Sequence, residues 1–230
     1  MSRQTTLVLQ RVILSVAICT DSNTNHHTMV HELNDKMLPK CYLGGCEGEI
    51  GEREVASAFT GPTATRPSGC QRVLELGGGS GSVSTVIQQR LKNPELHVVV
   101  QPRDETMFGG VQKLQANKEA CNSSFHIVDH VLKPGEEDYV VFLLKGYPDC
   151  LVADCEDCLV NEYNKNPGLF REVQHVQVER DDPHQNYTKL LRDILRLSHI
   201  HTGRGCGVDT ATEDMKRNGM LCTTEVWERK

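Results

Sequence analysis

The chain has 230 residues, of which 38% are hydrophobic, and it carries a formal net charge of -6. This length suits one domain, or one domain with an appendage, and the composition fits a soluble α/β protein better than a membrane protein. Because the chain is acidic and has no run of clustered lysines and arginines, we expect no nucleic-acid partner.

The N-terminal part of the chain is predicted to be an irregular extension over residues 1–69. Its most apolar stretch, residues 7–19, is interrupted by a glutamine and an arginine, so it is too short for a stable membrane span. It could be a targeting segment within residues 1–19, or a strand or helix that packs on the domain. Farther along, only residues 52–59 have the composition of a short helix. The sequence slightly favours a cytoplasmic location for the protein, and the secretory pathway is the alternative.

Ten cysteines are scattered along the chain, and one Cys-x-x-Cys pair occurs, Cys155 and Cys158. A zinc site would need a second close pair or two histidines at ligand spacing, so we expect no zinc site. Buried or free thiols are the favoured interpretation. If the chain is secreted, Cys41 and Cys46 are close enough in sequence to form a disulfide.

The most informative stretch is residues 73–84, VLELGGGSGSVS. An apolar run ends abruptly in four glycines, and an amphipathic run follows at once, which predicts a strand, a tight glycine loop and a helix. Glycines permit backbone angles that a Cβ would block, and they let a ligand approach the backbone. The first turn of the helix adds unpaired N–H groups that suit a negatively charged group.

The spacing of the glycines indicates which ligand the loop takes. A dinucleotide fingerprint would need glycine or alanine at position 82, where the chain has Ser82, so a nicotinamide dehydrogenase is disfavoured. The pattern present is Glu75-x-Gly77-x-Gly79-x-Gly81, which resembles motif I of the class I S-adenosylmethionine-dependent methyltransferases. The alternative is an ordinary strand-to-helix turn that binds no ligand.

From residue 70 onward the pattern alternates between strand-like and helix-like segments. It predicts an α/β fold, a doubly wound and mostly parallel sheet with helices on both faces, in one domain over residues 70–230. The resemblance implies that this is the Rossmann-like fold of class I methyltransferases. Further strands are predicted over residues 96–100, 125–128, 151–153, 173–178 and 221–227, and further helices over residues 104–120 and 189–197.

Polar residues that follow the predicted strands are the candidates for the site, because function lies along the carboxyl edge of such a sheet. The resemblance implies that Glu75 and the glycine loop (Gly77, Gly79, Gly81) take the methionine part of S-adenosylmethionine. Gln101 stands where an acid normally accepts hydrogen bonds from both ribose hydroxyls. Asp129 follows the third strand and is expected to accept from the adenine amino group, or else to be a loop acid or helix cap.

A second pattern narrows the resemblance. A strand runs into Asp154-x-Glu156, and another strand about twenty residues later ends in Glu179, an order that resembles the FkbM family of methyltransferases over about residues 70–182. The chain departs from the family pattern twice, with Gln101 in place of a glutamate and Asp157 in place of a glycine. The resemblance implies O-methylation of hydroxyl groups on sugars and related natural products.

The acids of this second pattern are the candidates for catalysis. Methyl transfer requires that the acceptor hydroxyl be aligned and lose its proton. Asp154, Glu156 and Glu179 would supply the base or orient a small-molecule or glycan acceptor, although such carboxylates could instead hold a divalent metal. The alternative is a non-catalytic binding module descended from a methyltransferase, in which Gln101 and Asp157 mark lost contacts. The sequence does not indicate an oligomeric state.

Overall fold

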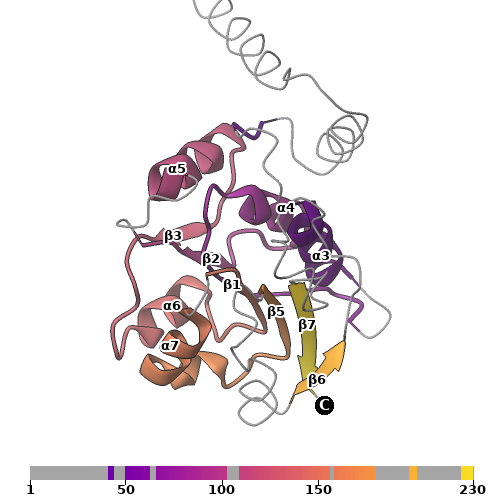
Figure 1. Cartoon of the computed structure of the whole chain (residues 1–230), viewed down its shortest axis with the longest axis vertical. Coiled ribbons are helices and arrows are strands. Elements are labelled where there is room, and N and C mark those ends of the chain that lie inside the picture. The colour runs from indigo at the N-terminus through magenta and orange to yellow at the C-terminus, as the bar shows by residue number, and fades with distance from the viewer. Residues whose placement is uncertain are drawn as a thin grey trace, which may run out of the picture.

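The computed structural model describes residues 41–43, 50–62, 66–102, 109–155, 158–179, 197–200 and 224–229. Within these ranges the strands form one seven-stranded sheet in the order β3-β2-β1-β4-β5-β7-β6 (Figure 1). The first five strands are parallel, whereas β7 runs antiparallel to both β5 and β6. The mostly parallel, Rossmann-like sheet predicted from the sequence is therefore confirmed. The strands are β1 (Val73–Leu76), β2 (His97–Val100), β3 (His126–Val128), β4 (Cys150–Ala153), β5 (His175–Glu179), β6 (Leu197–Ile200) and β7 (Thr224–Arg229).

Helices cover both faces of the sheet, with α3 and α4 on one face and α6 and α7 on the other (Figure 1). None of the described helices is long and apolar enough to cross a membrane. The helical elements are α3 (Ile50–Thr60), α4 (Ser82–Arg90), α5 (Gly110–Ala120), α6 (Glu137–Leu143), α7 (Cys158–Lys165) and the 3-10 helix η2 (Pro167–Phe170).

Strand β1 shows why helices pack on both faces of the sheet. Val73 packs into the apolar cluster formed with α3 and α4, whereas Leu74 and Leu76 pack into the cluster that contains residues of α6 and α7. Alternate residues of a strand point to opposite faces, so a strand that is apolar at almost every position is buried on both sides. Every residue of β1, β2 and β4 is buried, and each buried valine or leucine side chain stabilises the fold by about 1.5–3 kcal/mol.

The folded unit begins upstream of the boundary expected at residue 70. Ala56 and Phe59 of α3 pack in the same cluster as Val73, and α3 contacts α4, β5 and β7. The helix expected over residues 52–59 is present within α3. Residues 1–19, in which a targeting segment was expected, lie outside the described residues.

Several element boundaries differ from the prediction. The helix expected over residues 104–120 is described from Gly110, directly after Gly109 in the left-handed conformation with φ 89°. The helix expected over residues 189–197 lies outside the described residues except for Leu197, which belongs to strand β6. Helices α6 and α7 were not predicted, because each is short and opens in a polar stretch without a strong start signal.

Among the described residues, six cysteines form disulfides, Cys41–Cys121, Cys70–Cys150 and Cys155–Cys158, so the expectation of free thiols is wrong for these six. Cys41 is bonded to Cys121 at the end of α5 rather than to Cys46, which lies outside the described residues. The first two disulfides each join residues 80 positions apart. Closing a loop of that length in the unfolded chain stabilises the folded state by roughly 4–5 kcal/mol in the chain-entropy model.

Candidate functional site

The register of the parallel strands brings the predicted site residues to one edge of the sheet. Leu76 lies beside both Val100 and Ala153, Val100 lies beside Val128, and Ala153 lies beside Val178. The residue that follows each of these therefore lies at the same carboxyl edge, with neighbouring strands about 4.8 Å apart. The residues in this row are Gly77, Gln101, Asp129, Asp154 and Glu179.

The glycines of the loop after β1 serve two different purposes. A Cβ on Gly77 would collide with the carbonyl group of Asp154, and a Cβ on Gly81 would lie 2.8 Å from Leu114 Cδ1. These two glycines are therefore required by the packing of the loop itself. Gly79 has φ +47°, and no atom of the described residues lies within 4 Å of where its Cβ would be. Gly79 is thus the position at which the loop leaves open space for a ligand.

The side chain of Gln101 holds the glycine loop in place. It is fully buried, and its amide oxygen accepts a hydrogen bond from the backbone N–H of Gly79 at 2.6 Å. The resemblance led us to expect this side chain at two ribose hydroxyls. In the structure its oxygen is instead directed at the loop, so the residue positions the backbone around the open side of Gly79.

Glu75 also differs from the expectation that it faces a ligand. Its two carboxylate oxygens accept hydrogen bonds from the Ser84 hydroxyl and from His97 Nε2, each at 2.8 Å, and the side chain is buried. The amide nitrogen of Gln88 donates to the carbonyl oxygen of Pro94 and to His97 Nδ1. Because an amide nitrogen can only donate, Nδ1 accepts and Nε2 carries the hydrogen. Glu75 therefore joins β1, β2 and α4 beneath the loop.

The remaining predicted acids lie at the edge with different degrees of exposure. Asp129 is 35% exposed and lies 3.4 Å from His130 Nδ1. Asp154 and Glu179 are half-buried at the ends of β4 and β5, and Glu156 lies outside the described residues. Among the residues described, no three histidine, cysteine, aspartate or glutamate side chains are close enough to hold a metal ion.

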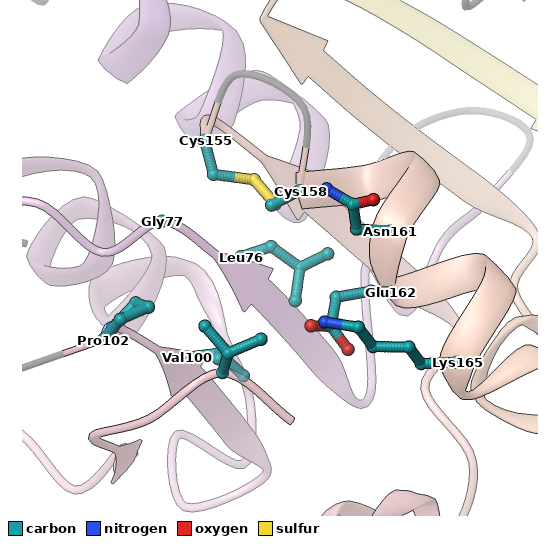
Figure 2. Close-up of a pocket in the computed structure, with 10 residues that line it drawn as sticks. Leu76, Gly77, Val100, Pro102, Cys155, Cys158, Asn161, Glu162 and Lys165 are labelled. Atoms are coloured by element: carbon teal, nitrogen blue, oxygen red, sulfur yellow. A yellow bond between two sulfur atoms is a disulfide. The ribbon is translucent and has the colours of Figure 1, made fainter. Parts of the chain in front are cut away.

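A cavity of about 340 Å³ opens at the carboxyl ends of β1 and β2 (Figure 2). This volume lies within the range of small-molecule sites, about 300–1,000 Å³. One side of the cavity is apolar and consists of Leu76, Val100, Pro102 and Val131, next to Gly77. The other side comes from Cys155, which precedes α7, and from four residues of α7: Cys158, Asn161, Glu162 and Lys165.

Glu162 is a site residue that the sequence analysis missed. It lines the cavity although its exposed fraction is only 4%, and its Oε2 accepts from Asn166 Nδ2 at 3.3 Å. Burial raises the pKa of the Glu162 carboxyl, whereas Asn166 and Lys165 act in the opposite direction. Glu162 is three residues after the buried Leu159, which places it on the same, apolar face of α7. An acid at such a position is the sequence feature that could have identified Glu162.

A short N-terminal segment supports the loop from outside the cavity. The hydroxyl groups of Tyr42 and Ser80 are hydrogen-bonded at 2.5 Å, and Asn117 of α5 donates to the carbonyl oxygen of Ser80 at 2.8 Å. The Cys41–Cys121 disulfide fixes this segment to the end of α5. The glycine loop is therefore held by Tyr42 on one side and by Gln101 on the other.

No protein-family model matches the chain, and no curated protein matches it. Among solved structures, it is similar to an O-methyltransferase from Bacillus cereus in complex with SAH, at 11% identity over 96% of each chain with a TM-score of 0.47. It is also similar to the O-methyltransferase TomG from Streptomyces achromogenes in complex with SAM, at 13% identity over 100% of each chain with a TM-score of 0.44. A protein in the NADB-Rossmann superfamily from Streptococcus agalactiae has 9% identity over 76% of this chain and 66% of its own, with a TM-score of 0.48.

These identities and TM-scores are low, so the fold is assigned from the sheet itself. A parallel β3-β2-β1-β4-β5 core that ends in an antiparallel β7 inserted before β6 is the Rossmann-like class I methyltransferase fold. The glycine loop lies after β1 of this sheet, directly beside the cavity.

Proposed function

We propose that the chain is an S-adenosylmethionine-dependent O-methyltransferase that acts on a hydroxyl group of a sugar or another small molecule. The observation that carries the proposal is the cavity at the ends of β1 and β2, next to a loop whose Gly79 is open on one side. In an open α/β sheet, ligands bind outside the carboxyl ends of the strands, where this cavity lies.

The residues present fit such a cofactor. Leu76, Val100 and Pro102 offer an apolar surface to a nucleoside, and the missing side chain of Gly79 allows close approach to the loop. The loop leads directly into α4 at Ser82, whose first turn contributes backbone N–H groups that suit a carboxylate. When bound, S-adenosylmethionine supplies a methyl group on a positively charged sulfur.

The acids at the carboxyl edge of the sheet are proposed to orient and deprotonate the methyl acceptor. Asp154 and Glu179 follow the paired residues Ala153 and Val178, which places them next to each other on adjacent strands. In this proposal Asp154 removes the proton of the acceptor hydroxyl and Glu179 orients the acceptor, with Glu156 contributing from the segment between β4 and α7. The succession of glycine loop, Asp154-x-Glu156 and Glu179 supports an FkbM-like enzyme.

One observation favours a second candidate, a non-catalytic binding module. Asp129, Asp154 and Glu179 do not belong to the described lining of the cavity, and Gln101 directs its oxygen at the loop. A chain of this kind would bind the nucleoside without transferring a methyl group.

The test is a methyl-transfer assay with isotopically labelled S-adenosylmethionine and a panel of glycans and small hydroxylated metabolites. The proposal predicts transfer to at least one hydroxylated acceptor, and Asp154→Asn lowers the rate by on the order of a hundredfold or more because the base is lost. Binding of S-adenosylhomocysteine without transfer to any acceptor would instead identify the binding module. Transfer that is unaffected by Asp154→Asn would contradict the role of Asp154.

A further inference from the structure

The cavity contains a single carboxyl group among its described lining residues, that of Glu162 on α7. Figure 2 shows this side chain extending from the helix toward the wall formed by Leu76 and Val100. Its exposed fraction is 4%, so the carboxyl group is almost completely removed from bulk water. A buried acid that borders a cavity is expensive to maintain unless a partner satisfies it.

The protein satisfies this carboxyl group only in part. Asn166 Nδ2 donates to Oε2 at 3.3 Å, and within the described residues this is the hydrogen bond that the Glu162 side chain makes. A carboxylate has about four acceptor positions, so most of its capacity is unused. Burial raises the pKa of Glu162, and the hydrogen bond from Asn166 and the charge of Lys165 offset this only in part. The cavity therefore presents a strong acceptor that a donor on a ligand could satisfy.

The apolar wall of the cavity opposite Glu162 limits which chemical group of a ligand can carry the hydrogen-bond donor. Val100, Pro102 and Val131 contribute apolar surface there. The face of an aromatic ring suits such a wall, whereas the two hydroxyl groups of a ribose would find no partner on the apolar side. An adenine base combines an aromatic face with one exocyclic amino group that donates hydrogen bonds.

We propose that Glu162 accepts a hydrogen bond from the exocyclic amino group of the adenine base, so that it selects adenosyl ligands from a position on α7. This inference rests on the proposed function, since it assumes that the cavity takes the nucleoside. It assigns base recognition to a residue that lies outside the row of acids at the strand ends.

The test compares S-adenosylhomocysteine with its 6-deamino analogue, which lacks only the amino group, by isothermal titration calorimetry. The wild-type chain is expected to bind the adenosyl ligand on the order of ten- to a hundredfold more tightly, as for a hydrogen bond to a charged group. Glu162→Ala is expected to bind the two ligands equally. Glu162→Gln keeps the shape and an acceptor oxygen but loses the charge, so its preference should be intermediate.

Controls separate this inference from the proposed function. Lys92→Ala removes an exposed charge outside the cavity lining and should leave the preference for the amino group intact. A full wild-type preference in folded Glu162→Ala, or no preference in the wild type, would overturn the role of Glu162 while the cofactor proposal stands. Failure of the folded wild-type chain to bind S-adenosylhomocysteine would overturn both. Thermal unfolding of each variant verifies that it is folded, and Glu162→Gln replaces Glu162→Ala if the latter is not.

Discussion

The backbone N–H of Gly79 donates to the amide oxygen of Gln101 at 2.6 Å, which joins the glycine loop after β1 to the residue that follows β2. The two residues are 22 positions apart, and the parallel pairing of β1 with β2 brings them together. The loop is thereby held in a fixed position at Gly79, and the same loop borders the cavity at Gly77.

Replacing Gln101 with leucine removes this acceptor. The half-buried Gly79 N–H then lacks its partner in the folded chain, so we expect the free energy of unfolding to fall by about 1 kcal/mol. Gln101→Glu keeps an oxygen that can accept the same N–H but places a charge at a fully buried position, so it should also be less stable than the wild type. Urea denaturation measures the free energy of unfolding of both variants. A Gln101→Leu protein as stable as the wild type would show that this hydrogen bond does not contribute to stability.

Replacing Gly79 with alanine tests whether the open side of the loop admits the ligand. The φ of +47° makes any side chain there unfavourable by about 1–2 kcal/mol, but the Cβ meets no described atom. Gly135, with φ +87° and equally open surroundings, is a control for the loss of stability, although its N–H donates to Asn166, the partner of Glu162. We expect both variants to lose similar stability, and Gly79→Ala to weaken S-adenosylhomocysteine binding relative to the wild type in calorimetry. An affinity of Gly79→Ala equal to that of the wild type would rule out close ligand approach at Gly79.

Replacing Glu75 with alanine should destabilise the fold. The variant leaves the Ser84 hydroxyl and His97 Nε2 without an acceptor inside the core, and each buried donor left unsatisfied costs about 1–3 kcal/mol. In a double-mutant cycle with His97→Leu, we expect the combined loss to be clearly smaller than the sum of the single losses. Additive losses would mean that the two side chains do not interact.

Stability should decrease on acidification because of His175. Burial, and then the nearby Arg66 guanidinium, lower the pKa of His175 to about 4, and the Glu228 carboxylate 3.6 Å from Nδ1 does not offset them. Between pH 6.5 and 4 the unfolded chain binds a proton at this histidine that the folded chain does not, so stability is full above pH 6.5 and is lost as the pH falls toward 4. Thermal denaturation of the wild type and of His175→Gln over this range checks the prediction, which requires a shallower pH dependence in the variant.

The sequence predicted the central part of the fold because the signals there are local. Residues 73–84 change from an apolar strand to glycines and then to a helical pattern, and the structure has β1, the loop and α4 at these positions. The antiparallel position of β7 was not predictable in the same way, because it depends on how the chain returns to β5 after residue 179. No local pattern encodes that return.

The candidate site was predictable in position but not in contacts. Gln101 and Glu75 lie where motif spacing placed them, yet their side chains bind the loop and its neighbours rather than open space. The pairing of Cys41 with Cys121 and the burial of Glu162 arise from tertiary packing between distant segments. Sequence periodicity alone cannot identify such partners, because it reports which face of an element is buried and not what covers it.

The most direct measurement is a crystal structure of the chain with S-adenosylhomocysteine. We predict that the nucleoside lies in the cavity between the Val100–Pro102 wall and α7, with its amino group at Glu162 and its amino-acid portion near Gly79. A nucleoside bound elsewhere, or a cavity without ligand in crystals grown at a saturating concentration, would contradict the assignment.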